Sequence, residues 1–269
     1  MGRAILVIDA IELPVPDPTA SPNAALETLP TSKHGTAKAI PSLMGKPAIA
    51  GTYQPDHASV VSALEKLLLE RSGDRHLVLI QDFPDPDALS SAWAYQLICK
   101  NYNVDCDIYY GGTLSHQENI TLVRLSGLPV RRWNPQTKTG PDLSKYQAYV
   151  LLDTQGTTCQ LIRTVEASQL PLFLVVDHHA PQKEIDANLV DLRPQIRATA
   201  TIMTQYLQSE QLLVLDKSNS THVKCATALM HGIRSDTSNL MHAGEADFGA
   251  AAYLSNYYDP QLLAAILRA

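Results

Sequence analysis

Acidic and imidazole side chains follow three short apolar runs in the middle of the sequence. Asp85 and Asp87 come soon after one run, Asp153 comes directly after another, and His178 and His179 come after a third. A single aspartate at such a place is usually a helix cap, but three such places, one with a double histidine, predict a shared site. Crowded carboxylates repel one another unless cations lie between them. We therefore predict a pair of divalent ions about 4 Å apart, an arrangement that clamps both oxygens of phosphoryl transfer.

Oxygen-rich ligation with little imidazole favours Mn²⁺ or Mg²⁺ over Zn²⁺. Two such ions in one site are the cofactors that we expect. The formal net charge of −6 and the pI near 5.8 argue against binding to long duplex nucleic acid. They leave room for a small phosphorylated substrate, because bound metal supplies positive charge locally.

The apolar runs predict the elements that position these side chains. Strands alternate with helices, which predicts an α/β fold with a mainly parallel β-sheet covered by helices on both faces. Ligands of open α/β sheets bind beyond the carboxyl ends of the strands, so the residues after each run should share one edge. The predicted strands cover residues 77–80, 107–110, 148–152 and 172–176, and the predicted helices cover 88–101, 117–125, 159–167, 198–208, 222–234, 246–257 and 260–268.

The chain of 269 residues divides by composition into three parts. Residues 1–75 form an N-terminal extension, with a proline-rich linker at 12–55, a possible short edge strand at 5–8 and one helix of about four turns after Asp56. The linker contains eight prolines and can bury little apolar surface to offset its ordering entropy. Residues 76–260 carry the alternating strands and helices, and residues 261–269 follow them.

Cysteines and hydropathy indicate the compartment. The four cysteines are widely spaced and include no CxxC pair, which predicts buried thiols in a reducing compartment and argues against a disulfide framework or a thiolate zinc site. No run approaches the length of about 18 apolar residues that a membrane span needs. The expectation is a cytoplasmic protein that does not bind membranes.

Four segments resemble the motifs of the DHH phosphoesterase superfamily. Asp177-His178-His179 after an apolar strand resembles the signature that names it, and residues 85–91 resemble its first motif, DxDAxGS, with Ser90 at the glycine. Asp153 matches the lone aspartate of the second motif, and residues 232–237 resemble the fourth. The four occur in family order over about residues 76–260. The resemblance implies the α/β fold described above and metal-dependent phosphoester hydrolysis by two-metal activated water. It also implies that residues 76–260 form the catalytic domain and that residues 261–269 begin a linker to an absent C-terminal domain.

The resemblance also implies individual roles. One ion would be held by Gln81, Asp85 and Asp153. The other would be held by Asp87, Asp153 as the bridge, His178 and Asp236. His179 would face the phosphate, and Arg234 would reach a phosphate oxygen, with a solvated arginine at a helix end as the alternative.

Two departures from the family pattern leave the function open. Gln81 stands where the family usually has histidine, and its carbonyl is a neutral and poorer ligand. The chain also stops about where the linker to the family's usual C-terminal domain, termed DHHA1, would begin, so we expect either a single-domain member of the family or a piece of a longer protein. In size and in its fourth motif it is most similar to the group acting on very short RNAs and 3′-phosphoadenosine 5′-phosphate. The expected partner is thus a small nucleotide or a short single-stranded RNA or DNA, with a homodimer as a possible assembly. The alternatives are a catalytically weakened nucleotide sensor and an inorganic pyrophosphatase or polyphosphatase-like hydrolase.

One further candidate is a helix start rich in small residues, Ala198-Thr199-Ala200-Thr201. Free amide groups at a helix start can bind an anion. A substrate phosphate is therefore one hypothesis for this segment, and an ordinary helix start is the other.

Overall fold

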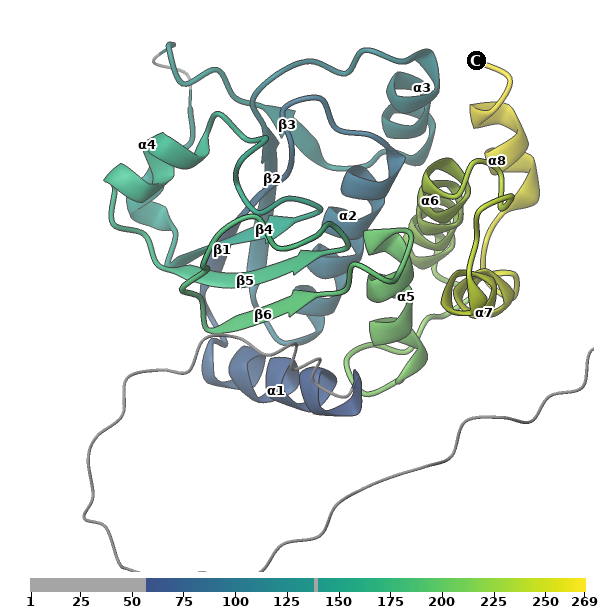
Figure 1. Cartoon of the computed structure of the whole chain (residues 1–269), viewed down its shortest axis with the longest axis horizontal. Coiled ribbons are helices and arrows are strands. Elements are labelled where there is room, and N and C mark those ends of the chain that lie inside the picture. Colours follow the sequence, from purple (N-terminus) through teal and green to yellow (C-terminus); the bar gives the residue numbers. More distant parts are fainter. Residues whose placement is uncertain (1–56, 138–139) are drawn as a thin grey trace, which may run out of the picture. The chain divides into compact units, whose positions relative to one another are not determined.

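The computed structural model describes residues 57–137 and 140–269. Within them, six parallel strands form one sheet in the order β3-β2-β1-β4-β5-β6, with helices on both faces (Figure 1). This confirms the predicted fold class. The strands are β1 (Arg75–Leu79), β2 (Asp105–Tyr110), β3 (Val130–Arg132), β4 (Ala148–Leu152), β5 (Leu172–Asp177) and β6 (Leu189–Leu192). The helices are α1 (His57–Glu70), α2 (Pro86–Asn101), α3 (Gln117–Ser126), α4 (Ile162–Ala167), α5 (Thr199–Gln208), α6 (Ser220–Asp236), α7 (Glu245–Leu254) and α8 (Pro260–Ile266).

The strand order reverses between β1 and β4. From β1 the chain builds outward through β2 to β3, and from β4 it builds in the opposite direction through β5 to β6. Connections on the two sides of such a switch point leave in opposite directions and open a crevice at the carboxyl ends of the central strands. The segments after β1 and β4, which carry the predicted ligands, both begin at this crevice.

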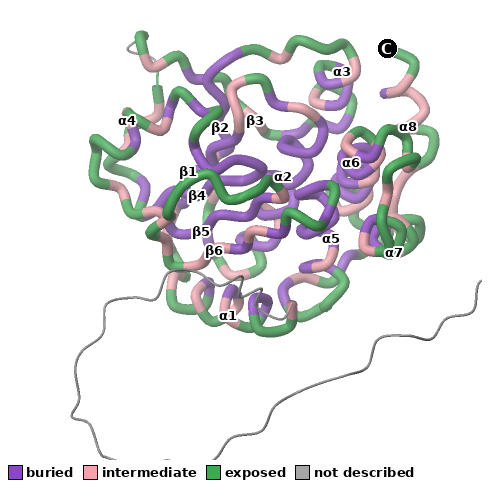
Figure 2. Tube along the Cα trace, in the orientation of Figure 1, coloured by how far each residue is buried: buried purple, intermediate pink, exposed green. Residues whose placement is uncertain are grey.

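Alternate residues of each central strand enter two separate cores. Val78, Val150 and Val176 point to the face covered by α2 and α5, whereas Leu79 and Leu151 point to the face covered by α4. Figure 2 shows the resulting buried centre of the sheet. Burial on both faces explains why these strands are continuous apolar runs in the sequence.

Two strands were not predicted, and both lie at the edges of the sheet. β3 has three residues, two of them exposed arginines, and β6 contains Asp191 within an otherwise apolar segment. An edge strand pairs on one side only and needs no continuous apolar run. The helix predicted over 159–167 is shorter than expected and covers only Ile162–Ala167, and the possible strand at residues 5–8 lies outside the described residues.

Helix α1 packs into the same core as the catalytic segment. Val60, Val61, Leu64 and Leu68 have the i, i+3/i+4 spacing of one helix face and are 2 % exposed or less. The proline-rich segment 12–55 lies outside the described residues. No helix in the described part of the chain is long and apolar enough to cross a bilayer.

Candidate metal centre

Asp85 and Asp87 lie at the beginning of α2, which starts at the crevice beyond the carboxyl end of β1. Pro86 begins the helix, where its fixed φ suits the first turn and its missing N–H is not needed. Asp85 is the N-cap: its Oδ1 accepts a hydrogen bond of 2.9 Å from the Ala88 N–H. Its Oδ2 points to Gln81, so one carboxylate both caps the helix and faces the site.

Asp87 caps a second helix, at a distance of more than one hundred residues in sequence. Its two oxygens accept hydrogen bonds of 2.7 and 2.6 Å from the N–H groups of Thr199 and Ala200, at the start of α5. The N-cap residue Ala198 has no polar side chain that could accept these hydrogen bonds. The phosphate hypothesis for this helix start is therefore wrong for those two amides, because the anion that they bind is Asp87.

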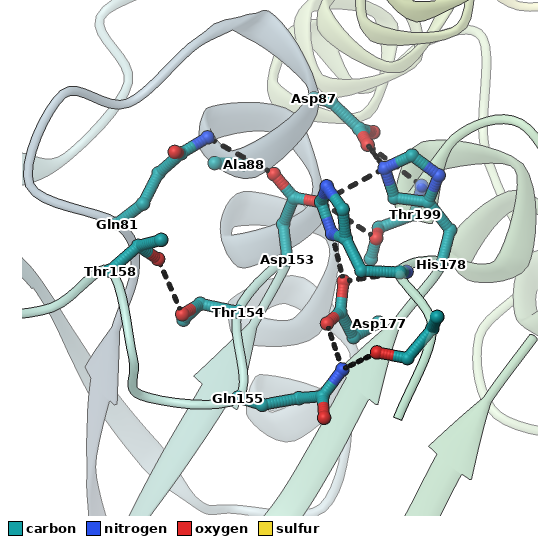
Figure 3. Close-up of polar contacts among 12 residues, drawn as sticks. Gln81, Asp87, Ala88, Asp153, Thr154, Gln155, Thr158, Asp177, His178 and Thr199 are labelled. Atoms are coloured by element: carbon teal, nitrogen blue, oxygen red, sulfur yellow. Dashed lines mark hydrogen bonds and ion pairs between the residues drawn. The ribbon is translucent and has the colours of Figure 1, made fainter. Parts of the chain in front are cut away.

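Asp153 is the most constrained of the predicted ligands. It follows β4 with φ of 56°, a left-handed conformation that few residues other than glycine, asparagine and aspartate adopt. Its Oδ1 accepts a hydrogen bond of 2.9 Å from the Thr199 hydroxyl, and its Oδ2 accepts one of 3.3 Å from the Gln81 amide. The side chain is thus held at the centre of the site, as Figure 3 shows.

His178 lies where three carboxylates converge. Its Nε2 is 3.8 Å from Asp87 Oδ2, 3.6 Å from Asp153 Oδ1 and 3.5 Å from Asp236 Oδ2. This nitrogen is buried and makes no hydrogen bond with the described residues. Asp236 is the last residue of α6. Helices α2 and α6 and the segments that directly follow β4 and β5 therefore each contribute one group to the cluster.

The cluster holds more negative charge than its surroundings compensate. Burial, together with neighbouring Asp236 and Asp85, raises the pKa of Asp87 well above its usual value, and burial and the other aspartates do the same to the pKa of Asp153. Burial and Asp85 raise the pKa of Asp236 to about 7. Burial lowers the pKa of His178, so its imidazole is neutral and free to act as a ligand.

His179 differs from its neighbour in partner and in exposure. Its side chain is half exposed, and its Nδ1 lies 2.7 Å from Asp177 Oδ1, a contact that raises the pKa of His179. Gln155 donates a hydrogen bond of 2.9 Å to the other Asp177 oxygen. Asp177 is buried, yet these hydrogen bonds from His179 and Gln155 outweigh the effect of burial and lower its pKa. The sequence analysis gave Asp177 and Gln155 no separate role, and Gln155 carries no motif by which it could have been found.

Gln81 presents its amide nitrogen to the site. Nε2 donates hydrogen bonds of 3.2 Å to Asp85 and 3.3 Å to Asp153, and so bridges the two carboxylates of the first predicted ion. For the Gln81 carbonyl oxygen to bind a metal ion, the side-chain amide would have to rotate by half a turn. Arg234 is half-buried, and its positive charge contributes to lowering the pKa of nearby His231. Arg234 makes no ion pair with the described residues.

The residues present fit a divalent cation at the second predicted position. Ligand atoms of Asp87, His178 and Asp236 lie within 4.8 Å of one another, as do those of Asp153, His178 and His179. The described residues bring no lysine or arginine within ion-pair distance of Asp85, Asp87, Asp153 or Asp236. A cation among these oxygens would relieve the repulsion and give the orphaned Nε2 a partner.

Close helix packing supports this arrangement. A Cβ on Gly232 of α6 would lie 2.7 Å from Ser90 Oγ and 3.1 Å from the Asp87 Cα. Ser90, which stands at the glycine of the first motif, is accommodated because α6 has a glycine opposite it. Gly232 therefore lets α6 approach α2 closely enough for Asp236 to meet Asp87.

The described geometry agrees with the family comparison. The model of the DHH family N-terminal domain matches residues 76–233, more than half of the chain. The chain belongs to the DHH family.

One curated protein and several solved structures are similar to this chain. An uncharacterized protein of Methanocaldococcus jannaschii is 36 % identical over 189 residues, which cover 70 % of this chain and 36 % of that protein. The chain thus spans about a third of the length of this curated relative. An exopolyphosphatase-related protein from Bacteroides fragilis has the same fold, with a TM-score of 0.64 at 13 % identity, over 79 % of this chain and 61 % of that one. RecJ from Thermus thermophilus in complex with Mn²⁺ is a weaker match, with a TM-score of 0.34 at 12 % identity over 82 % of this chain and 38 % of that one.

Proposed function

We propose that this protein hydrolyses a phosphoester of a small nucleotide or a very short oligonucleotide, using Mn²⁺ or Mg²⁺. The observation that carries the proposal is the convergence of Asp87, Asp153 and Asp236 on the buried, unpartnered Nε2 of His178. These residues would hold one ion, and Asp85, Asp153 and Gln81 would hold a second. Bound ions would supply Lewis-acid stabilisation of phosphoryl oxygens and an activated water.

The residues around the ion site would bind and orient the phosphate. His179 is half exposed, and its raised pKa favours the charged form, which suits hydrogen bonding to a phosphate oxygen. Asp177 fixes the ring through Nδ1, which leaves Nε2 available. Arg234 provides a second cation without an ion-pair partner among the described residues, two residues before Asp236.

A pocket beside the ions supports a substrate larger than phosphate. It has a volume of about 480 Å³ and is lined by Asp85, Pro86, His116, Asn119 and Ser235, among others. This volume lies within the usual range for sites of small organic ligands, about 300–1,000 Å³. The lining also includes the carboxylate of Glu118. The polar groups of His116, Asn119 and Ser235 could bind the base and sugar, which leaves the phosphate to the metal ligands. On this basis we favour a nucleotide substrate over pyrophosphate or polyphosphate.

One observation favours a second function, that of a catalytically weakened nucleotide sensor. The Gln81 amide already joins Asp85 to Asp153, the place where the first ion would bind. A protein that binds one ion in the whole carboxylate centre, rather than two, would keep its affinity for the nucleotide and lose turnover. Metal stoichiometry in the presence of nucleotide separates the two functions.

The test is release of phosphate or nucleotide with Mn²⁺, from 3′-phosphoadenosine 5′-phosphate, from a two-nucleotide RNA and from polyphosphate. Asp153→Asn is the inactivating variant. Asp105→Asn is the control, because Asp105 is an exposed aspartate of β2 in an ion pair with Arg75. Release by the wild type and the control, with none from Asp153→Asn, supports the phosphoesterase. Equal release from all three proteins would contradict the placement of the metal, and nucleotide binding without release would favour the sensor.

A further inference from the structure

A second group of metal-ligating side chains lies at the opposite end of α2. Ligand atoms of His76, Cys99 and Cys106 lie within 4.8 Å of one another, although the residues are spread over thirty positions in sequence. His76 of β1 and Cys106 of β2 face each other in the parallel register. Cys99 reaches them from the last turns of α2, which packs against β2.

His76 has the features of a prepared metal ligand. It is fully buried, and its Nδ1 lies 2.8 Å from the Tyr95 hydroxyl, one helical turn before Cys99. Its Nε2 is buried with no hydrogen-bond partner in the described structure. Metal-bound histidines in proteins usually hold their second ring nitrogen in such a hydrogen bond, which fixes the ring. Burial lowers the pKa of His76 to about 4, so the ring is neutral as a ligand must be.

The two thiols differ in burial, since Cys99 lies in the core with His76 whereas Cys106 is half-buried. Cys99 is fully buried, and burial, with Cys99 as its neighbour, raises the pKa of Cys106 well above its usual value. The Cys106 thiol is therefore neutral in the metal-free protein, so the cluster adds no charge from this residue to the core. Cys106 also lines a pocket of about 490 Å³ between α2 and the end of α3, which offers a route from solvent.

We propose that His76, Cys99 and Cys106 form a binding site for a thiophilic ion such as Zn²⁺, separate from the carboxylate centre. Two sulfurs and one imidazole nitrogen are soft and borderline donors, which select Zn²⁺ or Cu⁺ over Mg²⁺ and Mn²⁺. Tetrahedral Zn²⁺ with Zn–S bonds of about 2.3 Å needs ligand atoms about 3.8 Å apart. The ligand atoms of these three residues lie within 4.8 Å of one another, which is compatible with that spacing. Binding releases the two thiol protons to solvent, so affinity falls as the pH is lowered.

The sequence spacing argued against a thiolate site because no CxxC pair is present. The fold supplies the proximity instead, through strand register and one turn of α2. An ion there would join the end of α2 to β1 and β2, and Tyr95 would act as a positioning residue for the ring. The site does not depend on the proposed hydrolysis.

The experiment is titration of the full chain with Co²⁺ under reducing conditions, followed by the near-ultraviolet thiolate-to-Co²⁺ charge-transfer absorption. The carboxylate centre contains no thiol and cannot produce this band. We expect one equivalent of Co²⁺ to produce it in the wild type and in Asp153→Asn, and Zn²⁺ to displace it. Cys99→Ser and Cys106→Ser should lose the band and lower Zn²⁺ affinity by more than about 100-fold. Tyr95→Phe should lower it by about 10-fold, as expected for an outer partner.

Cys225→Ser is the matched control, because Cys225 is equally buried but lies on α6, outside the cluster. It should keep the full band. Absence of the band from the reduced wild type would overturn the proposal, and so would its persistence in Cys99→Ser. The wild-type measurement decides the question even if a serine variant does not fold. A Cys99–Cys106 disulfide in non-reducing mass spectra, with no band after reduction, would replace the ion site with a redox pair.

Discussion

The two ends of helix α2 offer opposite donor chemistry. Its first turn faces Asp153 and His178 across the crevice of the sheet, and its last turns place Tyr95 and Cys99 against His76. The first end crowds carboxylates that a cation would hold together, while the second collects two thiols and an imidazole in the core. If both proposed sites bind their ions, a single helix would separate two ions by hardness, since oxygen donors select Mn²⁺ or Mg²⁺ and sulfur donors select Zn²⁺.

The largest expected effect comes from removing the shared carboxylate. Asp153→Asn should lower Mn²⁺-dependent hydrolysis by about 1,000-fold, because metal catalysis supplies several kcal/mol and each 1.4 kcal/mol is a factor of ten. Asparagine keeps the volume of the side chain and tolerates the left-handed backbone. The metal-free variant should unfold at a higher temperature than the wild type, since one repelling buried charge is gone. Calorimetry and the rate together check this, and an unstable variant would contradict the repulsion.

Each end of α2 also has a buried neutral histidine near it, His76 at one end and His231 on α6 at the other. Burial and Arg234 lower the pKa of His231 to about 4, against 6.5 in the unfolded chain. The unfolded state therefore binds a proton first as the pH falls, and stability present above pH 6.5 is lost between pH 6.5 and 4. The loss is about 3 kcal/mol at most.

His231→Gln should lack this loss. Urea unfolding at pH 7 and pH 4.5 should show a smaller difference for the variant than for the wild type, while effects of the carboxylates cancel in the comparison. His242→Gln, at an exposed histidine, is the control and should behave as the wild type. An unchanged pH dependence in His231→Gln would mean that His231 is protonated in the folded protein.

Replacing Gln81 by histidine would add a nitrogen donor to the carboxylate end of α2, and the donor set there would become more similar to that of the thiol end. Gln81→His replaces an amide that donates to Asp85 and Asp153 with an imidazole that can ligate. We expect the affinity for a second Mn²⁺ to rise by about 10- to 100-fold, measured by titration calorimetry. The Co²⁺–thiolate band should not change. Two tightly bound ions in the wild type would contradict our interpretation of the Gln81 hydrogen bonds.

The smallest expected effect concerns the packing that holds only the carboxylate end together. Gly232→Ala places a methyl group 2.7 Å from Ser90 Oγ and should lower the free energy of unfolding by about 1–2 kcal/mol. It should also weaken Mn²⁺ binding, because α6 carries Asp236. Gly249→Ala, in an open position of α7, should instead stabilise the protein by about 0.5–1 kcal/mol. Equal effects of the two changes would show that α6 and α2 are not in close contact.

The sequence by itself determined the central sheet and most of the carboxylate end. The buried strands are continuous apolar runs, and the site residues follow them directly, so both signals are local in the chain. The short edge strands β3 and β6 escaped because pairing on one side leaves no apolar run to detect.

Only the tertiary structure decided which groups partner across long separations. Asp87 caps α5 rather than leaving its amides for a phosphate, and the Gln81 amide rather than its carbonyl faces Asp85 and Asp153. His76, Cys99 and Cys106 carry no motif, yet strand register and helix packing bring them together. The physical reason is that the type of a side chain can be read from the local sequence, whereas its neighbours in a folded core depend on how distant elements pack.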